Sequence, residues 1–125
     1  MKQLLAVTAV IEIGAGLAML VAPTVVAQLL LGAGISGETI PIGRLAGVAL
    51  LALGIACWLA RGDTESRAAR GLVVGMLVYN IGAAGIFGAA GNQAHTLGIA
   101  LWPVVILHTF MAVWCASLLM KKLKH

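Results

Sequence analysis

The residue best able to do chemistry in this sequence is a glutamate inside an apolar stretch. Glu12 stands ten residues after Lys2, in the run LLAVTAVIEIGAGLAMLV. At a rise of about 1.5 Å per residue, a helix would carry this carboxyl about 15 Å from the start of the run, near the middle of a bilayer. A charge at that depth costs from about 2.5 to above about 10 kcal/mol, so such residues face the interior of a helix bundle and often have a function. The residues on its own helical face are mostly small: Thr8, Ala9, Ala15, Gly16 and Met19.

Three further polar residues reach a similar depth from other parts of the chain. Tyr79 and Asn80 lie nine and ten residues after an arginine, and His108 lies thirteen residues before a pair of lysines, about 20 Å along a helix. A single intramembrane polar layer is therefore allowed, made of Glu12, Tyr79, Asn80 and His108. Such a layer could pass a proton, bind a small polar ligand, or fasten the helices by hydrogen bonds, for instance through a protonated glutamic acid. The sequence leaves these alternatives open.

The sequence also contains residue types and spacings that would allow a metal or redox site. His108, Met111 and Cys115 follow one another at spacings of three and four, which puts them on one helical face, and Cys57 falls at a comparable depth in another stretch. Imidazole, thioether and thiolate groups suit Cu(I). The chain has no C-x-x-C motif and no methionine-rich run, so packing is the favoured interpretation and we expect neither a metal nor another cofactor. Since G-x-S-x-G, H-E-x-x-H and glycine-rich phosphate motifs are also missing, we expect no catalytic residues and no enzyme.

The elements that must position these residues are membrane-spanning helices. Hydrophobic residues make up 62% of the 125 residues and charged residues only 10%, a composition that a water-exposed surface cannot carry. A spanning helix needs about 20 apolar residues, and four such stretches use most of the chain: 4–22, 42–60, 71–90 and 97–120. We therefore predict one all-α domain over residues 1–125, an integral membrane four-helix bundle. Because Glu12 interrupts the first stretch, we expect a spanning helix there and not a cleaved signal sequence.

The connections between these stretches indicate the orientation. The first connection is long, and its apolar part, residues 25–31, could form a short helix in the membrane interface. Basic residues of short loops gather in the cytoplasm, which places both termini there, in a bacterial cytoplasmic (inner) membrane. Arg44 alone would lie outside, and seven basic residues inside: Lys2, Arg61, Arg67, Arg70, Lys121, Lys122 and Lys124. These positions at helix ends account for the net charge of +4, so we expect the lipid bilayer and not a nucleic acid as the partner.

Two stripes of small residues suggest how the helices pack. Each has the four-three spacing of a helix seam, and small residues let helices in lipid approach closely. Both stripes could pack within one bundle, which is the favoured interpretation, or form the face of a homo-oligomer. The stripes are Gly43, Gly47, Leu50, Gly54 and Cys57 in the second stretch, and Gly71, Gly75, Val78, Gly82 and Gly85 in the third.

Two segments of the first half of the chain carry a family resemblance. TVVAQLLLG after Pro23, followed by GRLAGVALLALGIACWLAR at 43–61, resembles the small bacterial four-helix inner-membrane proteins, the DoxX-like family and uncharacterised ones. The resemblance implies the same membrane bundle and transfers no functional residue. We predict a small non-enzymatic membrane protein, an accessory or assembly component of a larger membrane complex. The alternatives are a small proton-linked carrier that uses Glu12 and His108, and a membrane metal or redox site.

Overall fold

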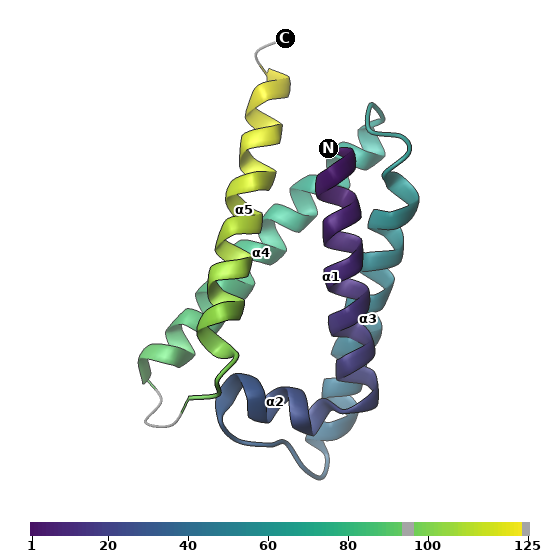
Figure 1. The fold of residues 1–125 in the computed structure, drawn as a ribbon. Helices are drawn as coiled ribbons and strands as arrows, with labels where there is room; N and C mark the ends of the chain where they lie inside the picture. The colour runs from purple at the N-terminus through teal and green to yellow at the C-terminus, as the bar shows by residue number, and fades with distance from the viewer. Residues whose placement is uncertain (94–96, 124–125) are drawn as a thin grey trace.

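The computed structural model describes residues 1–93 and 97–123 of the chain, and within these ranges it is all-helical, without strands. Four of its five helices are long and apolar enough to cross a membrane, which makes the chain a multi-pass membrane protein by helix length and composition. The predicted all-α architecture with four membrane-spanning candidates is thereby confirmed. Figure 1 shows the helices in chain order: α1 (Lys2–Val21), α2 (Pro23–Leu31), α3 (Thr39–Ala60), α4 (Arg67–Gln93) and α5 (Leu101–Leu123).

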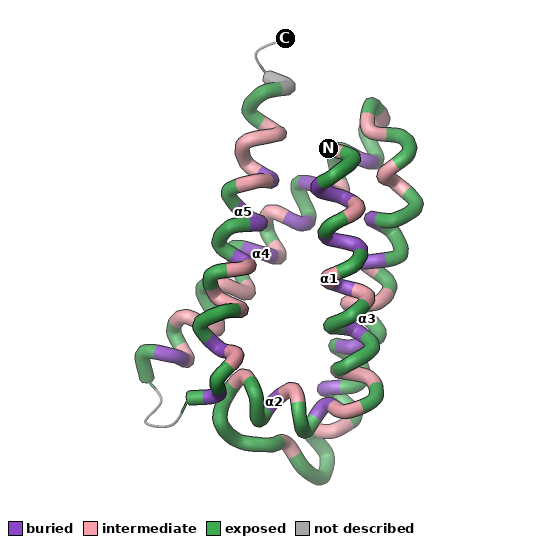
Figure 2. The backbone as a smooth tube through the Cα atoms, in the orientation of Figure 1, coloured by how far each residue is buried: buried purple, intermediate pink, exposed green. Residues whose placement is uncertain are grey.

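The four long helices form two pairs. α1 packs along α3 and α4 packs along α5, whereas α3 and α4 touch little. The short helix α2 crosses one end of the bundle and contacts α1, α3 and α5 (Figure 1). Figure 2 shows buried residues where the two members of each pair meet and exposed residues over the outer faces. Since large apolar side chains of these helices are exposed, such as Val10, Ile106 and Val113, the exterior suits a lipid environment.

Glycines set the distance between α1 and α3. A Cβ atom added at Gly47 would lie 2.7 Å from the Leu20 nitrogen and 2.8 Å from the Gly16 carbonyl oxygen. A Cβ atom at Gly54 would lie 2.9 Å from the Ile13 nitrogen. Because only hydrogen fits at these positions, the glycine stripe of α3 packs inside the bundle, against α1.

The second glycine stripe behaves differently from the prediction. Cβ atoms at Gly71, Gly75, Gly82 and Gly85 would meet nothing within 4 Å among the described residues. The prediction that this stripe packs within the bundle is therefore wrong. The physical reason is that α4 turns its larger side chains inward instead, and these are buried at helical spacing: Ala69, Val73, Met76 and Asn80.

The short helix α2 is held between the two pairs. Proline at its first position ends α1 and starts α2, and Gly32, with φ of 75°, ends it. The Ala100 amide donates a hydrogen bond of 2.8 Å to the Leu29 carbonyl oxygen of α2, and Gly98 lies directly against that same carbonyl. The chain around Gly98 therefore packs against α2 in a non-helical conformation. As a result, α5 begins at Leu101, four residues later than the sequence predicts.

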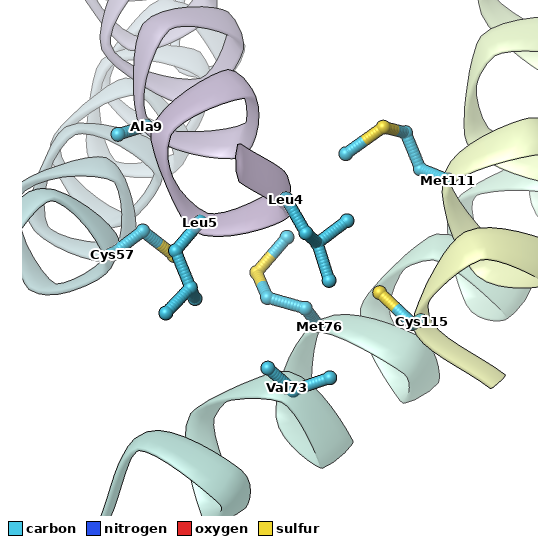
Figure 3. Close-up of a cluster of buried hydrophobic side chains, with 8 residues drawn as sticks. All are labelled: Leu4, Leu5, Ala9, Cys57, Val73, Met76, Met111 and Cys115. Atoms are coloured by element: carbon cyan, nitrogen blue, oxygen red, sulfur yellow. The ribbon is translucent and has the colours of Figure 1, made fainter. Parts of the chain in front are cut away.

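A cluster of buried hydrophobic side chains joins the two pairs at the end opposite α2. Figure 3 shows the cluster, which we call the core cluster, between α1, α3, α4 and α5. Its members are Leu4, Leu5, Ala9, Cys57, Val73, Met76, Met111 and Cys115. The N-terminus, the α3–α4 connection and the last turns of α5 lie at this same end of the bundle (Figure 1). The two helix pairs are thus fixed to each other by the core cluster at one end and by α2 at the other.

Candidate functional site: a cavity with a polar inner end

A cavity of about 720 Å³ lies between the two helix pairs, on the α2 side of the core cluster. Its volume falls within the range of about 300–1,000 Å³ that is usual for small-molecule sites. All five helices line it, and small side chains create the space because they do not fill the gap between the pairs. The alanines in the lining are Ala15, Ala18, Ala46, Ala49, Ala83 and Ala100.

Three side chains carry the polar groups in this lining: Glu12 of α1, Tyr79 of α4 and His108 of α5. Each stands at the core-cluster end of the lining on its own helix. On α1 the lining runs from position 11 to 19 and on α4 from 78 to 87. At the other side it runs from Ala100, just before α5, to position 108 of α5. The cavity is therefore polar at its inner end, next to the core cluster, and apolar from there to α2.

A hydrogen bond between the side chains of Asn80 and His108 links α4 to α5. The Asn80 amide nitrogen donates a 2.7 Å hydrogen bond to the Met76 carbonyl oxygen, and the Asn80 amide oxygen lies 2.8 Å from His108 Nδ1. Because a carbonyl only accepts, the nitrogen of the amide must face Met76 and its oxygen must face the imidazole. His108 Nδ1 therefore donates its hydrogen to Asn80, and in the neutral ring Nε2 is left as an acceptor.

Tyr79 connects this pair to Glu12. Its ring meets the His108 ring edge-on, with centroids 5.5 Å apart and planes at 85°. Its hydroxyl is within hydrogen-bonding reach of the Glu12 carboxyl. The structure thus brings together all four residues that helix spacing places at one depth, and they link α1 to α4 and α5.

Three of these four polar side chains are almost fully buried. Glu12 is 3% exposed, Asn80 1% and His108 8%. No basic side chain among the described residues forms an ion pair with Glu12. Nor does any described residue offer a hydrogen bond to His108 Nε2. The inner end of the cavity therefore presents a carboxyl without a counter-ion and an imidazole nitrogen without a donor.

The candidate metal ligands do not converge. Met111, Cys115 and Cys57 belong to the core cluster, where Cys57 and Cys115 lie on opposite sides with Leu4, Leu5 and Met76 between them (Figure 3). Both thiols are free and buried. Within residues 1–93 and 97–123, no three His, Cys, Asp or Glu side chains come close enough to hold a metal ion. His108 uses Nδ1 for Asn80 and not for a shared ligand set.

The cavity is the feature that the sequence did not predict. The sequence does contain a pattern that indicates it: pairs of alanines three residues apart, at 15 and 18 in α1 and at 46 and 49 in α3. These alanines line the same cavity from the two helices. Chemically, the site can hold an apolar body along its walls and hydrogen-bond a polar group at its inner end. Comparisons of the chain with protein-family models, with curated proteins and with solved structures find no match.

Proposed function

We propose that this protein is a non-enzymatic membrane protein that binds a lipid-soluble small molecule in the cavity between its helix pairs. The observation that carries the proposal is the cavity of about 720 Å³ whose polar groups all stand at one end. A molecule with an apolar body and a polar head would lie with its head on Glu12, Tyr79 and His108 and its body toward α2. This develops the carrier alternative and not the accessory role, because an accessory protein needs no ligand-sized cavity.

The orientation in the membrane is part of the proposal. We infer that the core-cluster end faces the cytoplasm of a bacterial inner membrane, because the described basic residues at that end, such as Arg61 and Arg70, outnumber those at the α2 end. Arg61 lies over the Trp58 ring, 3.4 Å from its centroid, an arrangement that suits an anchor at the membrane surface. In this orientation α2 lies in the outer interface. The head-group site then sits near mid-membrane.

The experiment uses a photoreactive long-chain alcohol with the protein in lipid nanodiscs. We expect saturable labelling of residues that line the cavity, located by mass spectrometry of peptides. Replacing Ala49, which lines the cavity, by phenylalanine should fill part of the space and reduce the labelling at least tenfold. The matched control is Ala52→Phe, because Ala52 is exposed on the same helix and does not line the cavity.

The outcome that would contradict the proposal is labelling that rises linearly with probe concentration, or labelling that Ala49→Phe and Ala52→Phe change equally. Either result would mean that the probe samples the lipid-facing surface and not the cavity. Circular dichroism of each variant checks that the helices are retained.

A further inference from the structure

We infer that the molecule bound in this cavity is a lipophilic cation, specifically an amphiphile whose head is an ammonium group with at least two N–H bonds. The inference rests on the proposed function, since it concerns the head group of the same ligand. It follows from the kind of polar groups that the inner end of the cavity presents.

The polar groups at the inner end of the cavity attract positive charge. The lining contains one acidic side chain, Glu12, and no lysine or arginine among the described residues that form it. His108 Nε2 adds an acceptor, because Nδ1 already donates to Asn80. The Tyr79 hydroxyl, the remaining side-chain donor among the described residues of the lining, is within hydrogen-bonding reach of Glu12. A head group entering this space therefore meets acceptors.

The Glu12 carboxyl needs a counter-ion to be stable as an anion in this cavity. A buried carboxylate is costly in apolar surroundings unless a cation accompanies it. Glu12 has no basic partner within the described part of the chain. An ammonium head supplies this partner from the ligand, and the carboxylate and the ligand charge then neutralise each other away from water.

The inner end of the cavity offers an ammonium head more than one contact. One N–H of an ammonium can be donated to Glu12, whose charge it neutralises, and another to His108 Nε2, which otherwise has no donor. The aromatic ring of Tyr79 also lines the inner end of the cavity, and ring faces attract cations. An alkyl carboxylate would instead place a second negative charge beside Glu12. An alcohol has a single hydrogen to donate and satisfies one acceptor.

The experiment compares three photoreactive probes with the same alkyl chain, ending in an ammonium, an alcohol or a carboxylate, in nanodiscs of uncharged lipid. We expect the ammonium probe to label the cavity at concentrations at least tenfold lower than the alcohol, and the carboxylate probe to label it least. Glu12→Gln should weaken labelling by the ammonium probe at least tenfold and so remove its preference over the alcohol. The control is Glu38→Gln, because Glu38 is an exposed acid at the start of α3 and should leave the preference intact.

The outcomes separate the two proposals. If the alcohol labels the cavity as well as the ammonium does, the inference about charge fails and the proposed binding function stands. The inference also fails if Glu12→Gln keeps the preference, because the preference would then come from the bilayer. If none of the three probes labels the cavity saturably, the proposed function itself fails.

Discussion

Replacing Gly47 by alanine tests the contact on which the α1–α3 pair depends. The new Cβ atom would lie 2.7 Å from the Leu20 nitrogen and 2.8 Å from the Gly16 carbonyl oxygen, and both neighbours are backbone atoms that cannot rotate away. Ordinary contacts of a Cβ atom begin near 3.4 Å, so the two helices must separate by about 0.7 Å, the difference between 3.4 and 2.7 Å. Overpacking of this kind costs about 1–3 kcal/mol.

The control for this variant is Gly75→Ala. Gly75 also lies inside a long apolar helix, but its Cβ atom would meet nothing within 4 Å in the part of the chain that the structure describes. Alanine favours the helix over glycine by about 1 kcal/mol at either position. This gain cancels when the two variants are compared, and the difference between their free energies of unfolding isolates the cost of the steric contact.

The assay is unfolding in mixed micelles with increasing SDS, followed by circular dichroism. We expect Gly47→Ala to unfold with a free energy about 1–3 kcal/mol lower than that of Gly75→Ala. If the two variants differ by less than about 0.5 kcal/mol, the cost of overpacking is absent and the close approach of α1 and α3 is refuted.

Three further predictions concern the other contacts that hold the bundle together. Asn80→Ala removes the acceptor of His108 Nδ1 and should lower the free energy of unfolding in SDS by about 0.6 kcal/mol, and at most about 1.7; an unchanged value would mean that the hydrogen bond contributes nothing. Gly98→Ala should separate the start of α5 from α2, because the new Cβ atom would collide with the Leu29 carbonyl. The Ala100 amide, which donates its hydrogen bond to that carbonyl, should then exchange its hydrogen faster, and an unchanged exchange rate would contradict the contact between α2 and the start of α5. Cys57 and Cys115 are fully buried free thiols, so a maleimide should modify them only after SDS unfolding, whereas rapid modification of the folded protein would contradict the packed core cluster.

The fold could be predicted largely from local properties of the sequence. Each spanning helix is a continuous apolar stretch, and its existence depends on length and composition, whatever its neighbours are. The depth of polar residues is similarly local, because it follows from the rise per residue. Counting residues from the nearest basic side chains puts Asn80 and His108 at a similar depth. In the structure Asn80 Oδ1 and His108 Nδ1 are 2.8 Å apart.

The arrangement of the helices could not be predicted in this way, since it depends on two surfaces at once. The glycine stripes of α3 and α4 have the same spacing, yet only the stripe of α3 is covered. α1 presents Gly16 to this stripe, so that backbone meets backbone from both sides. The stripe of α4 has no such partner within the described residues. The start of α5 was displaced for a similar reason, because its contact with α2 joins segments that are distant in sequence.

The cavity follows from the same arrangement and explains why a bound molecule would be selected over bulk lipid. The core cluster and α2 hold the pairs together at the two ends, while alanines between them cannot close the gap. In a bilayer such a space fills with whatever apolar chains are available. A plain acyl chain would leave the Glu12 carboxyl without a counter-ion and His108 Nε2 without a donor, and each unsatisfied buried polar group costs about 1–3 kcal/mol. A ligand with a matching polar head removes this cost. Since about 1.4 kcal/mol corresponds to a factor of ten in affinity, pairing even one of the two groups would favour the ligand over a lipid tail by a factor of about 5 to about 140.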